Sequence, residues 1–273
     1  MNRHFTAFVL SLLTIPAAAQ LPPGAGGVGD LLVAPTRVVL DDRTRSAEIA
    51  LINTGTAPAR YRIAFRHLRM DENGNLFEVT TPEGERFADP FVLYAPRQVT
   101  LEPRIAQTIR VRLRLPADAG EGEYRTHLEF HGLPPDDLNS GTADEGKVAI
   151  RVVPIYGVSI PLLVRRGASD AGVRIEELTV RPAGEGMEAE VTLERSGARS
   201  TYGNVTVRFR PEGGGAEEVV AAVNGIAMYV PLTKRRVRIP LGPARRGGVL
   251  RVTYVDAEAT VGTPPLEAQL VLR

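Results

Sequence analysis

Strict alternation of apolar and charged residues along short segments is the feature that most restricts the fold of this chain. It is clearest from Thr108 to Leu115, where the apolar and basic positions are Ile109, Val111, Leu113, Leu115 and Arg110, Arg112, Arg114. Successive side chains of a strand point to opposite faces of a sheet, so this segment has one apolar face and one charged face. No segment keeps apolar residues at the period of a helix. The pattern therefore predicts an all-β protein.

Turn signals separate many such segments. Asp71-Glu72-Asn73-Gly74 follows an alternating run and predicts a hairpin, because Asn-Gly tolerates positive φ at low cost. The chain holds 27 glycines and 21 prolines, which are spread along its length. About seven short strands in each half, with turns every 8–12 residues, are the signature of immunoglobulin-like sandwiches.

Two domains are expected. Gly167 to Gly172 reads GASDAG and has the composition of a linker. We expect one immunoglobulin-like β-sandwich over residues 31–166 and another over residues 173–273. Within the first, Pro35 interrupts the extended run from Leu31 to Leu40. Because proline cannot donate to a sheet ladder, this strand should lie at an edge or switch sheets at that point.

The N-terminus has the organisation of a signal peptide. Arg3 is followed by an apolar stretch from Phe5 to Ile15 and by the small residues Ala17 to Ala19. The stretch is too short to span a bilayer, and the alternative is a buried N-terminal helix. We expect residues 1–19 to be cleaved, residues 20–30 to be a flexible leader, and the product to be exported. No later segment is long and apolar enough to predict a membrane span.

Composition excludes several kinds of function. The chain has no cysteine, so disulfides, thiolate metal sites and a cysteine nucleophile are ruled out. The 33 basic and 32 acidic residues are interspersed, which does not indicate a nucleic-acid surface. There is no nucleophile elbow, phosphate loop or zinc-protease motif. We expect neither an enzyme nor a cofactor.

The sequence contains one candidate metal site. His127, Glu129 and His131 occupy alternate positions of a predicted strand and would share one face. The alternative, which we favour, is the solvent-facing side of a strand whose other side is core. Arg110, Arg112 and Arg114 form a charged stripe on another predicted strand. Either this stripe contacts an anionic partner or it faces solvent. Because charges of both signs are interspersed along the chain, we favour a stripe that faces solvent.

The stretch from Lys147 to Arg166 is the longest alternating segment. Val148, Ile150 and Val152 share one face and follow a polar, turn-rich loop over residues 132–146. Pro154 and Pro161 interrupt the ladder, which suits an edge strand better than the centre of a sheet. This stretch is predicted to be the last strand of the first domain. Its apolar face either fills a partner's groove or packs on the domain's own core.

The first domain resembles the periplasmic chaperones of pilus (fimbrial) assembly, the PapD-like family. The resemblance spans residues 31–166 in order; no one motif is specific, and the second domain matches only in size and strand pattern. The motifs are Val33-Ala34-Pro35-Thr36-Arg37, Leu51-Ile52-Asn53-Thr54, Ala95-Pro96-Arg97 with Leu101-Glu102-Pro103, Arg114-Leu115-Pro116-Ala117-Asp118, Glu123-Tyr124-Arg125 and Leu133-Pro134-Pro135.

The resemblance implies a boomerang of two sandwiches with a cleft between them, and a function. Such chaperones bind and cap pilus or related surface subunits by donating an edge strand, and they anchor the subunit's C-terminal carboxylate. Arg37 falls on the family's anchoring arginine, although it could be an ordinary solvated strand arginine. Pro161 stands where the family has a lysine, which leaves Arg37 alone or with Arg165 as a substitute.

The resemblance also implies where the protein works and with what. Val148, Ile150 and Val152 are the donor-strand candidates. The implied partners are a pilin-like or other secreted surface subunit and an outer-membrane usher. The implied compartment is the periplasm. The alternative is an exported structural or adhesive two-domain protein without a client.

Overall fold

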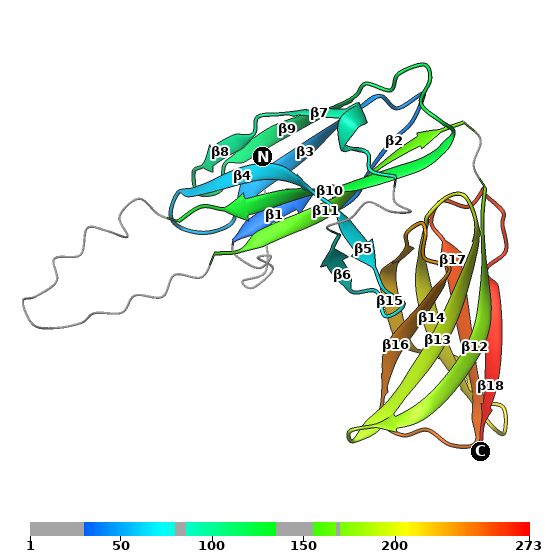
Figure 1. Ribbon diagram of the computed structural model, residues 1–273. Helices are drawn as coiled ribbons and strands as arrows, with labels where there is room; N and C mark the ends of the chain where they lie inside the picture. The colour runs from blue at the N-terminus through cyan, green and yellow to red at the C-terminus, as the bar shows by residue number, and fades with distance from the viewer. Residues whose placement is uncertain (1–29, 80–85, 135–154, 168–169) are drawn as a thin grey trace, which may run out of the picture.

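The structure is a computed structural model that describes residues 30–79, 86–134, 155–167 and 170–273. The described chain forms two β-sandwiches set at an angle, so that the molecule bends like an elbow (Figure 1). The predicted fold class is confirmed. Within the described ranges, no helix has the length and hydrophobicity needed to cross a bilayer.

Two sheets make the first sandwich. One sheet has the order β1, β3, β9, β7 and consists of Leu31–Ala34, Ser46–Asn53, Ala106–Leu113 and Val92–Ala95. The other has the order β2, β11, β10, β4, β8 and consists of Val38–Leu40, Gly157–Arg166, Gly122–Gly132, Ala59–Arg66 and Gln98–Leu101. A short 3-10 helix, η1 (Asp89–Phe91), precedes β7.

The chain changes sheets at Pro35, as predicted. β1 pairs with β3, whereas β2 pairs in parallel with β11 in the opposite sheet. The run from Leu31 to Leu40 is therefore two edge strands and not one. Arg37 lies in the crossing between them, outside either strand.

The predicted turn at residues 71–74 is confirmed and joins a separate hairpin. Its strands are β5 (Leu68–Met70) and β6 (Leu76–Glu78), and Gly74 has a φ of +86°. Asp71 accepts backbone hydrogen bonds from Asn73 and Asn75 at 2.8 and 2.9 Å, which shapes the turn. The hairpin extends from the first sandwich to the second (Figure 1).

The second sandwich has seven strands, the number expected from the sequence. One sheet has the order β12, β13, β16 and consists of Ala171–Ala183, Gly186–Gly197 and Lys234–Gly242. The other has the order β15, β14, β17, β18 and consists of Glu218–Met228, Thr201–Pro211, Gly248–Asp256 and Leu266–Leu272.

Each sandwich has its own hydrophobic core between its sheets. In the first, Phe130, Leu128 and Leu162 are fully buried, and in the second Val207, Leu250 and Tyr254 are at most 1% exposed. The alternating apolar positions predicted for β9 are core residues: Ile109, Val111 and Leu113. Sequence alternation thus identified the inward face of these strands correctly.

The stretch from Lys147 to Arg166 is described only from residue 155 onward. Its strand, β11, begins at Gly157, and β2 pairs with it only from Leu162 to Val164. From Gly157 to Pro161, β11 therefore has a strand neighbour on the β10 side alone, within the described part of the chain. Pro161 lies in this open-edged part, as expected for a proline. Val148, Ile150 and Val152 lie outside the described residues, as do the predicted signal peptide and most of the predicted loop.

Candidate functional site

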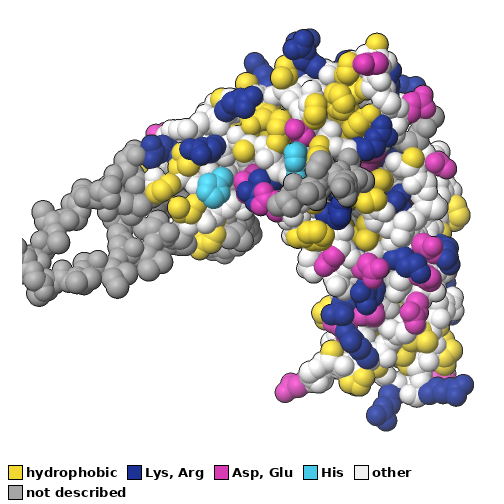
Figure 2. Space-filling view, viewed as in Figure 1, with side chains coloured by type: hydrophobic (Ala, Val, Ile, Leu, Met, Phe, Trp, Pro, Cys, Tyr) yellow, Lys and Arg dark blue, Asp and Glu magenta, His cyan; other side chains and the backbone are white. Residues whose placement is uncertain are grey.

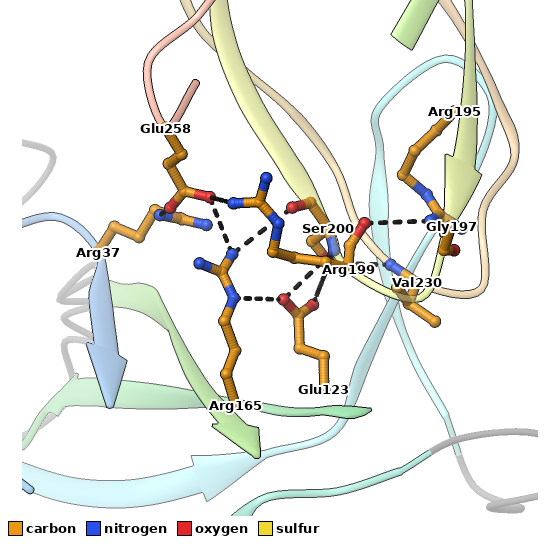
Figure 3. Close-up of polar contacts among 9 residues, drawn as sticks. All are labelled: Arg37, Glu123, Arg165, Arg195, Gly197, Arg199, Ser200, Val230 and Glu258. Atoms are coloured by element: carbon orange, nitrogen blue, oxygen red, sulfur yellow. Dashed lines mark hydrogen bonds and ion pairs between the residues drawn. The ribbon is translucent and has the colours of Figure 1, made fainter. Parts of the chain in front are cut away.

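A carboxylate in the inner corner of the elbow, Glu258, is held by three arginines (Figure 3). Arg165 donates to Glu258 Oε2 through Nη2 at 2.9 Å, and Arg199 donates to the same oxygen through Nη1 at 3.0 Å. Arg37 donates to the other oxygen, Oε1, through Nη1. Arg37 and Arg165 come from the first sandwich, whereas Arg199 and Glu258 come from the second.

A second carboxylate, Glu123, extends the same network. Its side chain is 1% exposed. It accepts a hydrogen bond from Arg165 Nε at 2.9 Å, and from the backbone N–H and the hydroxyl of Ser200 in the other sandwich. Ser200 Oγ in turn accepts from the backbone N–H of Val230 at 3.0 Å. The two carboxylates therefore join the domains through charge-assisted hydrogen bonds, which are stronger than neutral ones.

The fold brings these residues together through strand register and sheet ends. Glu123 in β10 lies directly opposite Arg165 in β11, so their side chains share one face of the sheet. Arg37 lies in the crossing just before β2, the parallel neighbour of β11. Arg199 immediately precedes β14 and Glu258 immediately follows β17, and these two strands are paired neighbours.

The electrostatics of the corner favour a bound carboxylate. Burial acts to raise the pKa of Glu258, but hydrogen bonds from Arg165 and Arg37 outweigh it, and the pKa is lowered. Burial acts to lower the pKa of Arg165, but Glu258 and Glu123 outweigh it, and the pKa is raised. Three guanidinium groups face two carboxylates, so one positive charge is in excess. Glu258 and Arg165 therefore stay charged at neutral pH.

Arg37 keeps unused hydrogen-bonding capacity in this corner. Its side chain is 12% exposed, so it is not the solvated strand arginine of the alternative interpretation. Its guanidinium lies over the ring of Tyr202, 4.9 Å from the centroid, in cation–π contact. Its Nε and Nη2 atoms are buried and have no hydrogen-bond partner among the described residues. These are the two donors of one edge of the guanidinium, the edge that can bind a carboxylate bidentately.

The face of β10 that carries Glu123 is covered from Glu123 to His127. His127 on this face is 1% exposed, and its ring meets Tyr229 of the second sandwich edge-on, with centroids 6.0 Å apart. Arg125 lies over the same tyrosine ring at 4.7 Å. The interpretation of this face as solvent-exposed was therefore wrong for His127, because the second sandwich covers it.

The metal-site alternative does not fit this arrangement. His127 is enclosed in the domain interface, whereas His131 is exposed at the other end of the run. Strand rise separates these two positions by about 13 Å, too far for both imidazoles to reach one ion. Among the described residues, no three His, Asp or Glu side chains gather closely enough to hold a metal.

Replacing His127 with leucine should stabilise the protein. Within the described part of the chain, neither ring nitrogen has a hydrogen-bond partner. Burial, with the charge of Arg125, lowers the pKa of His127 to about 3. Removing two unsatisfied polar atoms should raise the free energy of unfolding by about 1–2 kcal/mol at pH 7. The unfolded chain binds a proton near pH 6.5 but the folded chain does not, so the advantage of H127L should widen as the pH falls below about 6.

Urea unfolding of H127L and wild type at pH 7.5, 6.5 and 5.5 measures this difference. His131→Leu is the matched control, because His131 is exposed on the same strand. An H127L variant that is less stable than wild type, or a gap that narrows on acidification, contradicts the prediction.

The hairpin of β5 and β6 forms a second contact between the domains. Glu72 accepts a hydrogen bond from the backbone N–H of Arg236 at 2.7 Å and pairs with the Arg236 side chain at 3.1 Å. Met70 packs with Ala227 and Tyr229 in a small buried cluster. The hairpin therefore helps to set the angle at which the two sandwiches meet.

The sequence predicted some of these site residues and missed others. Arg37 and Arg165, proposed as carboxylate-binding residues, are brought together on Glu258. Pro161 lies on β11 opposite His127, and its place in the sheet is that of an edge residue. Glu258, Arg199 and Ser200 were not identified, because they flank strands of the second domain in no recognisable motif. Glu123 was part of the resemblance but had been given no role.

No family model and no curated protein matches the sequence. Among solved structures, the Pseudomonas aeruginosa CupB2 chaperone is 12% identical, with 89% of this chain and 100% of that chain covered and a TM-score of 0.45. The SafB chaperone, solved in complex with the Salmonella enterica SafA pilin, is 14% identical, with 90% and 99% covered and a TM-score of 0.42.

The periplasmic chaperone SfaE is a further similar structure, at 13% identity, 89% and 100% coverage and a TM-score of 0.41. The similarity to these chaperone structures extends over most of the length of the chain.

Proposed function

We propose that this protein is a periplasmic, non-enzymatic chaperone that binds and caps subunits of a pilus or related surface polymer. It would donate an edge strand to the subunit and anchor the subunit's C-terminal carboxylate. One observation carries the proposal: Arg37 and Arg165, which are far apart in sequence, meet at a single carboxylate in the corner of the elbow. That corner is already built to hold the chemical group that a subunit's C-terminus presents.

Glu258 marks where the partner's carboxylate would lie. The free donors of Arg37 and the excess positive charge of the corner support binding of a second carboxylate. Because these donors are buried, the incoming carboxylate would have to displace a side chain. Glu258 is the side chain that it would displace, since Glu258 is also a carboxylate and is bound to Arg37. The subunit's C-terminus would then exchange with Glu258 on Arg37, while Arg199 and Arg165 would keep their hydrogen bonds to Glu258.

The edge of β11 supports the strand-donation half of the proposal. From Gly157 to Pro161 only β10 pairs with it in the described part of the chain. An open edge offers backbone donors and acceptors to another chain. Residues 147–153 precede this edge in the sequence, and there Val148, Ile150 and Val152 would fill alternate pockets of the subunit. Delivery of the capped subunit to an outer-membrane usher is the step that such a role implies.

Co-expression with candidate subunits encoded by neighbouring genes tests the proposal. Wild-type protein should form one-to-one complexes that survive size-exclusion chromatography. Arg37→Ala should weaken them roughly hundredfold, or about 2.7 kcal/mol, because a desolvated charge-assisted pair is lost. Ile150→Asp should abolish capture, since it would place a charge in an apolar groove.

Matched controls separate binding from folding. Arg43→Ala removes an exposed arginine from the turn after β2 and should leave capture unchanged. Arg37→Lys keeps the charge but not the bidentate geometry and should bind with intermediate affinity. If both Arg37→Ala and Ile150→Asp capture subunits normally, the mechanism is wrong. If the wild type captures none, the structural or adhesive alternative takes its place.

A further inference from the structure

The first sandwich has a hollow on the sheet that does not carry the Glu258 corner. Its volume is about 910 Å³, and it lies where β7 begins and β9 ends. Arg45, Arg112 and Arg114 line it together with apolar side chains that include Leu93 and Phe91, and none of its lining residues is acidic. Figure 2 shows basic and hydrophobic side chains intermixed along the upper side of the first domain.

The three arginines of this hollow lack acidic partners. Among the described residues, no ion pair or side-chain hydrogen bond satisfies Arg45, Arg112 or Arg114. Other exposed arginines of the described chain do pair with acidic side chains. Arg110, the preceding arginine on the same face of β9, pairs with Glu48 at 3.3 Å. In the second sandwich Arg238 pairs with Glu190 at 3.0 Å. The hollow is therefore a local concentration of positive charge in a nearly neutral protein.

Strand register explains why charge and apolar surface adjoin here. Arg112 lies directly opposite Leu93 of β7, so the two side chains are neighbours on the outer face of the sheet. Leu93 is 48% exposed, so its side chain is open to contact from outside the sheet. Arg114 is held beside them, because its backbone N–H donates to the carbonyl of Phe91 at 2.7 Å.

The sheet edge beside the hollow is also unpaired. β7 is the last strand of its sheet, and no described strand pairs with its outer side. The backbone of such an edge can hydrogen-bond to an extended segment of any sequence. Side-chain pockets next to the edge select which sequence binds. The pockets here combine guanidinium groups with an apolar floor.

We propose that this hollow binds an acidic, extended segment of a partner protein that carries hydrophobic side chains between its carboxylates. Arg45, Arg112 and Arg114 bind the carboxylates, for which the planar guanidinium is well matched. Leu93 and Phe91 receive the intervening apolar side chain. The hollow and the Glu258 corner lie on different sheets of the first sandwich, so both can be occupied at once.

Fluorescence anisotropy with defined peptides tests this proposal on the full chain. The probe is a labelled octapeptide, Ser-Glu-Ser-Leu-Ser-Glu-Ser-Leu, in which Glu and Leu share one face of the extended chain. It is compared with peptides in which Gln or Lys replaces Glu. Wild-type protein should bind only the acidic peptide, more weakly as salt is added. Arg112→Glu and Arg114→Glu should each lower the affinity by about tenfold or more. Circular dichroism confirms that each variant is folded.

Three controls make the result specific. Arg246→Glu makes the same charge change at an exposed arginine of the second sandwich and should leave affinity unchanged. Leu93→Ser should weaken binding of the Glu–Leu peptide but not of a Glu–Ser peptide. Arg37→Ala should have no effect, which keeps this test independent of the proposed subunit anchor.

Several outcomes would overturn the proposal. Absence of binding by the wild type at millimolar peptide is one, and equal weakening by Arg246→Glu, which would indicate non-specific attraction, is another. Binding to phosphatidylglycerol vesicles that depends on Arg112, without binding to the peptide, would assign the hollow to a lipid surface instead of a protein.

Discussion

Replacing Glu123 with alanine is expected to lower the free energy of unfolding of the first sandwich by about 3–5 kcal/mol. The side chain is 1% exposed and accepts hydrogen bonds from Arg165 and from two groups of Ser200. Its removal leaves Arg165 buried with one partner fewer and Ser200 without its acceptor. Because these bonds cross the domain interface, the two sandwiches should also unfold in separate transitions. Differential scanning calorimetry measures both effects.

Glu48→Ala is the matched control for this prediction. Glu48 also pairs with an arginine, but the side chains of Glu48 and Arg110 are 67% and 82% exposed. Solvent screening limits such a surface pair to less than about 1 kcal/mol. If Glu123→Ala and Glu48→Ala lower the free energy of unfolding by the same amount, then the buried network stabilises the protein no more than a surface ion pair does, and the prediction is wrong.

Phe130→Ala is expected to destabilise the first sandwich by about 3–5 kcal/mol. Phe130 is fully buried in the core between the two sheets, so its truncation leaves a cavity that the packed strands cannot fill. It lies on β10, the strand whose opposite face carries Glu123 and His127. Loss of core packing should therefore also loosen the interface. Urea unfolding monitored by circular dichroism measures the change in stability.

The same substitution at Phe77 provides the comparison. Phe77 lies on β6 and is 47% exposed. Its truncation removes little buried surface and should change the free energy of unfolding by no more than about 0.5 kcal/mol. Comparable losses for Phe130→Ala and Phe77→Ala would show that the core between the sheets is not the main source of stability.

Features that depend on neighbours in the sequence could be predicted from it. The alternation of β9 follows from the two-residue period of a strand, so its core face was identified correctly. The sheet switch at Pro35 follows from the missing N–H of proline. The turn at residues 71–74 follows from the conformational freedom of Asn-Gly. These are local rules, and they are strong enough to specify the fold class.

The site could be predicted only in part. Arg37 and Arg165 were identified through a resemblance to a family and not from their spacing. Nothing local to residues 256–260 indicates that Glu258 meets them, because the contact depends on how one sandwich lies against the other. The donor-strand residues Val148, Ile150 and Val152 lie outside the described residues and remain a prediction.

His127 shows where reasoning from one strand reaches its limit. Alternation shows correctly that His127 and Glu123 point away from the core of their own sandwich. It cannot show whether water or another domain lies on that side. The sequence by itself determined two all-β sandwiches and the inward face of several of their strands, since these depend on short-range patterns. Only the tertiary structure decided that the outward face of β10 is buried from Glu123 to His127, because covering it requires Tyr229 and Ser200 from the other domain.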